Sequence, residues 1–129
     1  MESHIETGRL GEEIACRYIE GLGWRILERN WRWGHKEADI IAQYGRELII
    51  VEVKTRSASV FGSAIEAVKE PKQRNLIALA NRYISQFVLD LSVRYDVVGI
   101  DIAEDTSYTI THIERAFYPR LRGASRQAR

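Results

Sequence analysis

The stretch ADIIAQYGRELIIVEVKT, residues 38–55, decides the fold of this chain. Residues 47–55 contain an unbroken apolar run, Leu48 to Val51, that is rich in β-branched side chains. Such a run is typical of a strand covered on both faces, and therefore of a central strand. Residues 38–44 form a second strand-like segment, and Gly45-Arg46 between the two predicts a tight turn and an antiparallel hairpin.

The remaining elements follow from hydrophobic periodicity and from the residues that interrupt it. Gly21-Leu22-Gly23 ends a first helix, because glycine tolerates the left-handed conformation at a helix end. Residues 57–63 include three serines and a glycine and predict a loop, and Pro71 marks the start of a second helix. The predicted elements are a helix capped by Thr7 and running to about Glu20, strands over residues 24–33, 38–44 and 47–55, a helix from about Pro71, and strands over residues 93–102 and 108–113.

This order, αβββαββ, predicts an α/β domain in which helices flank a mixed central sheet in two or three layers. The chain has 129 residues, of which 45% are hydrophobic and 29% charged, and this suits one soluble domain. We expect residues 1–118 to form that domain. Residues 119–129 are rich in arginine and lack periodicity, and we expect a disordered tail there.

The N-terminus lacks the basic start and apolar stretch of a signal peptide, and no apolar run approaches the roughly 20 residues that span a bilayer. The single cysteine, Cys16, cannot form an intramolecular disulfide, and it lies among helix-forming residues as a small core side chain. These features favour a cytoplasmic protein without membrane contact.

The net charge of +1 hides an asymmetry. Residues 115–129 hold five arginines and no acidic residue. Removing these five from the 19 basic residues leaves 14 against 18 acidic ones, so the body of the protein carries −4. Affinity for nucleic acid must therefore come from local patches, from the tail, or from metal ions that neutralise clustered carboxylates.

Asp39, Glu52 and Lys54 form the constellation that carries chemistry. Alternate side chains of a strand share a face, so Glu52 and Lys54 point the same way at the end of an apolar strand. The hairpin turn brings Asp39 beside Glu52, and two neighbouring carboxylates repel unless they are protonated or bridged by a cation. Mg²⁺ or Mn²⁺ prefers such oxygen ligands. The alternative is a structural ion pair between Glu52 and Lys54, and it stays open at this point.

This constellation predicts metal-dependent hydrolysis of a phosphodiester by in-line attack of water. Asp39 and Glu52 would be metal ligands. Lys54 would position or help to deprotonate the attacking water, or neutralise charge that develops on the phosphate.

These segments together resemble the YraN family of small bacterial proteins, which is placed in the PD-(D/E)xK nuclease superfamily. The resemblance extends roughly from Gly8 to Ile102. At residues 35–37 the chain reads His-Lys-Glu where a glycine commonly precedes the glutamate, a departure that affects the loop more than the motif. The segments that carry the resemblance are GRLGE at 8–12, EAD at 37–39 (where the family usually shows Gly-Glu-Ile-Asp), VEVKTR at 51–56 and KQR at 72–74.

The resemblance implies a restriction-endonuclease-like core, close in layout to the archaeal Holliday-junction resolvases. It implies that Asp39, Glu52 and Lys54 are the motif residues. It also implies that Glu12 is an additional carboxylate near the metal, and that Gln73 is a polar residue that approaches the site from the second helix and supports catalysis.

Several cations and aromatic residues have two interpretations. Lys54, Arg56, Lys72 and Arg74 are candidates for a phosphate-binding patch, although solvated charges are the usual state of a helix start. Trp31 and Trp33 stand among basic residues, where an aromatic ring is able to stack on a base. We expect core packing for Trp31 and leave the role of Trp33 open.

The function expected from the sequence is that of a Mg²⁺- or Mn²⁺-dependent endonuclease that acts on DNA, with structured or branched DNA among its candidate substrates. One alternative is a nucleic-acid- or protein-binding module that keeps the nuclease fold with weak or no catalysis. Another is a structural or assembly role. A homodimer is expected by analogy with small resolvases that cut two strands.

Overall fold

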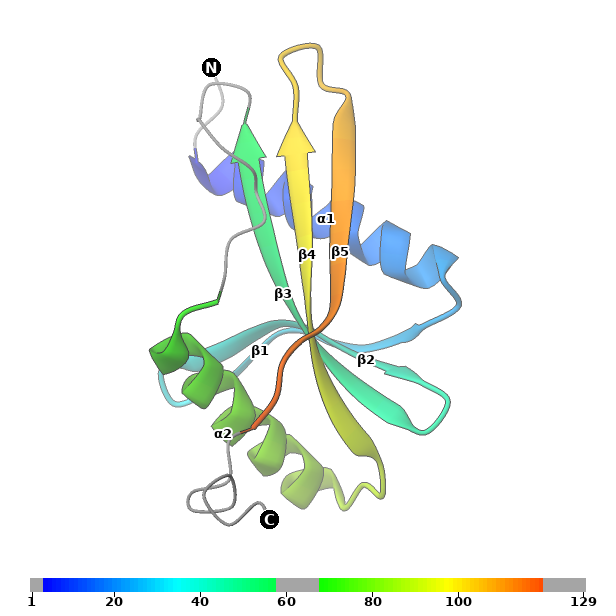
Figure 1. Ribbon diagram of the computed structural model, residues 1–129, viewed down its shortest axis with the longest axis vertical. Coiled ribbons are helices and arrows are strands. Elements are labelled where there is room, and N and C mark those ends of the chain that lie inside the picture. Colours follow the sequence, from blue (N-terminus) through cyan, green and yellow to red (C-terminus); the bar gives the residue numbers. More distant parts are fainter. Residues whose placement is uncertain (1–3, 58–67, 120–129) are drawn as a thin grey trace, which may run out of the picture.

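The computed structural model of the protein describes residues 4–57 and 68–119 (Figure 1). Its order of elements is αβββαββ, which confirms the order expected from the sequence. The elements are α1 (His4–Gly21), β1 (Arg25–Trp33), β2 (Lys36–Tyr44), β3 (Glu47–Ser57), α2 (Glu70–Phe87), β4 (Ser92–Ile102) and β5 (Tyr108–Phe117).

Two predicted boundaries were wrong. Helix α1 begins at His4, so Thr7 lies inside the helix and does not cap it; Glu6 supplies the acidic side chain that favours a first helical turn. Strand β5 continues to Phe117, beyond the predicted end at Ile113. Its pairing with β4 shifts register between Tyr95 and Val97, and Arg115 has a positive φ of 53°. This irregularity interrupts the alternation of side chains along β5 before pairing resumes at Phe117.

Two predictions fall outside the described residues. The predicted loop over residues 57–63 is described only at Ser57, which is the last residue of β3. Pro119 is the last described residue before the arginine-rich tail.

The five strands form one mixed sheet in the order β1-β2-β3-β4-β5. Strands β3 and β4 pair in parallel, and the other neighbours pair antiparallel. Strand β3 is therefore central, as its apolar run predicts. In Figure 1 the twisted strands fan out, with α1 behind β3, β4 and β5 and with α2 in front of β1.

The two helices bury opposite faces of the sheet and make three layers. Ile49 and Val51 pack in the cluster that contains α1, whereas Leu48 and Ile50 pack in the cluster that contains α2. Because side chains alternate along a strand, Glu52 and Lys54 continue the series that faces α2. No helix in the described part of the chain is long and apolar enough to cross a membrane.

Candidate functional site

The site lies where β2 and β3 stop pairing. Their ladder ends at the pair Ile40–Val51. Beyond this pair the backbone N–H of Val53 donates a hydrogen bond to Oδ2 of Asp39 at 2.8 Å. A buried amide needs an acceptor, and the Asp39 carboxylate supplies one where the neighbouring strand has diverged. This bond fixes the Asp39 carboxylate beside β3.

Glu52 is the second carboxylate of the site, and it is 7% exposed. Its Oε2 lies 3.7 Å from Nζ of Lys72, at the start of α2. Its Oε1 is buried and has no hydrogen-bond partner among the described residues. An unsatisfied buried polar atom costs about 1–3 kcal/mol, and more when it is charged. Within residues 4–57 and 68–119, this oxygen therefore has neither a donor nor a positively charged partner.

Burial and the mutual repulsion of these carboxylates change their proton affinities. Burial, followed by the charge of Glu52, raises the pKa of Asp39 to about 7, although the Val53 amide acts in the opposite direction. Burial also raises the pKa of Glu52, against the charges of Lys72 and Lys54 and a hydrogen bond with Asp39. In the absence of a cation, the pair therefore keeps a proton up to near-neutral pH.

Glu12 approaches the site because α1 packs unusually close to β3. A Cβ atom added to Gly11 would collide with the side chain of Thr55, so only glycine allows this approach. The charge of the neighbouring Glu12 adds to the effects that raise the pKa of Asp39. However, no three histidine, cysteine or acidic side chains within residues 4–57 and 68–119 form a group able to hold a metal ion. Glu12 is thus a longer-range neighbour and not part of a preformed trio with Asp39 and Glu52.

Two lysines act on Glu52. Lys54 lies two residues further along β3, and its charge lowers the pKa of Glu52. Within the described residues, however, Glu52 makes its ion pair with Lys72. The simple alternative of a Glu52–Lys54 ion pair is therefore not what the structure contains. The sequence placed Lys72 in a general phosphate-binding patch and gave no sign of its contact with Glu52.

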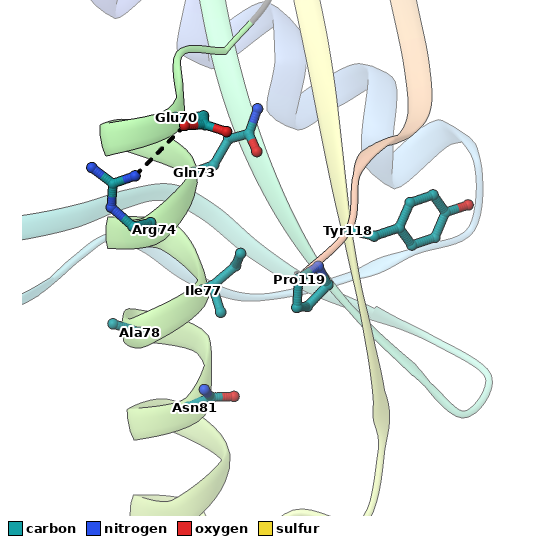
Figure 2. Close-up of a pocket in the computed structure, with 8 residues that line it drawn as sticks. All are labelled: Glu70, Gln73, Arg74, Ile77, Ala78, Asn81, Tyr118 and Pro119. Carbon is teal, nitrogen blue, oxygen red and sulfur yellow. Dashed lines mark ion pairs between the residues drawn. The ribbon is translucent and has the colours of Figure 1, made fainter. Parts of the chain in front are cut away.

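The side chain of Gln73 binds the backbone at the start of α2, a contact that the resemblance did not imply. Its side-chain Nε2 donates a hydrogen bond to the carbonyl oxygen of Val68 at 2.7 Å, and so anchors the segment that enters α2. Figure 2 shows Gln73 on the side of α2 that faces Tyr118 and Pro119, where these residues line a pocket of about 450 Å³. Arg74 lines the same pocket and pairs with Glu70 at 3.9 Å.

Of the four candidate phosphate-binding cations, three lie near the end of β3 and Arg74 lies apart from them. Lys72 contacts Glu52, and Arg74 contacts Glu70. Arg56 follows Lys54 by two residues on β3, so alternation places both on one face of the strand. Lys54, Arg56 and Lys72 remain near the end of β3, whereas Arg74 belongs to the pocket wall.

A second buried charge cluster, which sequence reasoning missed, joins α1, β4 and β5. Asp96 is 1% exposed and accepts hydrogen bonds from Arg94 at 2.9 Å and His112 at 2.8 Å, and His112 also contacts the Tyr18 hydroxyl at 2.9 Å. Burial acts to raise the pKa of Asp96, but the bonds from His112 and Arg94 outweigh it and lower the pKa. This cluster is well satisfied, unlike the pair Asp39–Glu52, and we interpret it as structural. Its one sequence signal is the pair of charges, Arg94 and Asp96, directly before the apolar run at residues 97–100 of β4.

Trp31 and Cys16 pack in or against the core as predicted, whereas Trp33 lies at the surface. Trp31 packs edge-on against Tyr83 with ring centroids 5.0 Å apart, which confirms its role in packing. Burial raises the pKa of the Cys16 thiol, which supports a core role for this residue. Trp33 is 41% exposed and contacts two cations.

The sequence matches the uncharacterised protein family UPF0102 over residues 11–100. The chain belongs to this family. A UPF0102 protein of Phocaeicola vulgatus is 46% identical over 121 residues, covering 94% of this chain and 99% of the relative. UPF0102 proteins of Bacteroides thetaiotaomicron and Flavobacterium johnsoniae are 45% and 43% identical, covering 94% and 92% of this chain and 99% and 98% of the relatives. Membership agrees with the expected family of small bacterial proteins, and the relatives' names give no activity.

Proposed function

We propose that this UPF0102 protein is a cytoplasmic, divalent-metal-dependent nuclease that hydrolyses phosphodiester bonds in DNA. The observation that carries the proposal is the buried Glu52 carboxylate, one oxygen of which has no hydrogen-bond partner among the described residues, beside a second carboxylate whose pKa is about 7. Among the described residues, Lys72 contacts one oxygen of Glu52, and the charges of Lys72 and Lys54 do not prevent burial from raising the pKa of Glu52. A divalent cation would supply further positive charge.

The residues present fit Mg²⁺ or Mn²⁺. These ions favour oxygen ligands, and Mg²⁺ is commonly bound through one or two carboxylates with water completing its shell. Asp39 and Glu52 would hold the ion, with Glu12 at longer range. When bound, the ion supplies Lewis acidity toward the phosphate and lowers the pKa of the attacking water.

The protein's own side chains account for the other requirements of hydrolysis. The Val53 amide holds the Asp39 carboxylate in place. Lys54, on the face of β3 that carries Glu52, stabilises negative charge on the phosphate as the water oxygen bonds to phosphorus. One of the two ester bonds between phosphorus and oxygen then breaks, and the leaving oxygen takes up a proton. Lys72 partly neutralises Glu52 before substrate binds.

The fold supports the same proposal. Carboxylates at the open end of an antiparallel hairpin, followed by a lysine on the central strand of a mixed sheet, are the layout that the PD-(D/E)xK resemblance implies. We therefore propose a restriction-endonuclease-like core for this chain. This part of the proposal is an analogy of fold, and the chemistry rests on the site.

The test is cleavage of labelled linear, single-stranded, flapped and four-way DNA with Mn²⁺, with Mg²⁺ and with EDTA. The proposal expects metal-dependent cleavage that is lost in Glu52→Gln and Lys54→Ala. Glu104→Gln is a matched control, because Glu104 is exposed in the turn before β5. Binding of DNA that persists in every variant without cleavage by the wild type would favour the binding-module alternative.

A further inference from the structure

Trp33, Lys36 and Arg82 form an exposed aromatic and cationic surface, the Trp33 patch. Trp33 ends β1 and pairs across the hairpin with Lys36, the first residue of β2. Nζ of Lys36 lies 5.3 Å from the centroid of the Trp33 ring, and Cζ of Arg82 in α2 lies 5.6 Å from it. The indole is nevertheless 41% exposed.

The two cations of the patch have no acidic partner in the part of the chain that the structure describes. Over residues 4–57 and 68–119, neither Lys36 nor Arg82 makes an ion pair with a carboxylate. Arg32, one residue before Trp33, does make one, with Glu37 at 3.5 Å. The patch therefore keeps net positive charge, although the body of the chain is acidic.

Core packing does not account for Trp33. Trp31, two residues earlier, contacts Tyr83 at the cluster under α2 and fills that structural role. Trp33 lies beyond this cluster, at the end of the hairpin. An exposed aromatic ring with unpaired cations beside it is the combination that stacks on bases and binds phosphates.

The patch shares a side of the sheet with the proposed active site. Trp33 contacts Arg82 of α2, and Glu52 contacts Lys72 of the same helix. Lys36 precedes Asp39 by three residues of β2, which is about 10 Å along an extended strand. Stacked nucleotides of one strand rise about 3.4 Å each, so this distance corresponds to about three nucleotides.

We propose that the Trp33 patch binds a single-stranded DNA segment about three nucleotides from the phosphate that is cleaved. An unpaired base stacks on Trp33, and flanking phosphates contact Lys36 and Arg82. Paired bases inside a duplex have both faces covered by their neighbours, so the patch selects flaps, loops or frayed ends. The distance to the cleaved phosphate rests on the proposed nuclease function, whereas the binding itself does not.

The test measures binding of a fluorescein-labelled oligodeoxythymidine by fluorescence anisotropy in EDTA, where cleavage is absent. We expect Trp33→Ala to weaken binding about tenfold, which is the usual contribution of one stacked base. Trp33→Phe should retain most of the affinity. Lys36→Gln and Arg82→Gln should each reduce the slope of log K against log salt by about 0.7.

The other end of β2, with the turn that follows it, offers matched controls. Tyr44→Ala removes an aromatic side chain that is 53% exposed, and Arg46→Gln removes an exposed cation. Both should bind as the wild type does. Oligonucleotide binding should also quench tryptophan fluorescence in the wild type, and Trp33→Phe should abolish the quenching while it keeps the binding.

The proposal is overturned if the patch variants keep the affinity and salt slope of the wild type and if quenching persists in Trp33→Phe. The patch would then be a contact that holds the hairpin against α2, or a protein-binding surface. Thermal unfolding checks each fold, and the two glutamine variants keep the indole if Trp33→Ala fails to fold. A protein that binds through Trp33 but never cleaves would refute only the nuclease. If the wild type cleaves DNA and every patch variant binds as the wild type does, only the proposal for the patch is refuted.

Discussion

Replacement of Asp39 by asparagine should stabilise the metal-free protein at about pH 8 and change its stability little at about pH 4. The folded protein has an Asp39 pKa of about 7, against 3.8 for an ordinary aspartate. It therefore keeps a proton that the unfolded chain releases above about pH 4, and wild-type stability falls as pH rises from about 4 to 7. An asparagine side chain carries no charge at any pH, so Asp39→Asn escapes this loss.

The size of the effect follows from the pKa difference. A shift of about 3 units corresponds to about 4 kcal/mol, which is an upper limit. The repulsion is shared with Glu52, and an amide oxygen accepts more weakly than a carboxylate from the Val53 N–H. We therefore expect a gain of about 2 kcal/mol in the free energy of unfolding at about pH 8.

The assay is urea unfolding in EDTA, followed by tryptophan fluorescence, for wild type and Asp39→Asn at several pH values between about 4 and 8. The difference in unfolding free energy should grow with pH and level off above about 7. A variant that is less stable than the wild type at about pH 8, or a difference independent of pH, would refute the reasoning. Asp39 would then be a stabilising partner of the nearby lysines and not a carboxylate that lacks a cation.

Three further predictions test other parts of the account. Mn²⁺ should raise the melting temperature of the wild type, more at about pH 8 than at about pH 6 because the ion competes with a proton, and a shift of equal size in Glu52→Gln would contradict this. Asp96→Asn should lower the free energy of unfolding at neutral pH by about 3 kcal/mol, because it leaves Arg94 buried with a broken pair, and unchanged urea unfolding would argue against the cluster's structural role. Gly11→Ala should cost about 1–3 kcal/mol in the same assay, since its Cβ meets Thr55, and full stability would show that α1 does not need this close approach.

The hairpin and its carboxylates were predictable because local rules determine them. The apolar run at Leu48–Val51 identified the central strand, and the turn at Gly45-Arg46 set which residues of the two strands lie opposite each other. With alternation along the strand, this register brings Asp39 beside Glu52. The end of the ladder at Ile40–Val51, which frees the Val53 amide for Asp39, has no such local signal.

Contacts between distant elements were not predictable. The ion pair of Lys72 with Glu52 depends on how α2 packs over the sheet, and periodicity does not specify that placement. The bond from Gln73 to Val68 depends on the path of the chain into α2. The Asp96–His112 contact needs β5 to pair with β4 in one register. Each of these is a consequence of tertiary packing.

Binding of Mn²⁺ to the purified protein, measured by the loss of the free-ion electron paramagnetic resonance signal at about pH 8, tests the central claim most directly. The account predicts that the wild type binds the ion, that Asp39→Asn and Glu52→Gln each weaken binding at least tenfold, and that Lys72→Gln strengthens it by removing a competing positive charge. Absence of binding by the wild type, or binding of equal strength in all four proteins, would contradict the claim that these two carboxylates form a metal site.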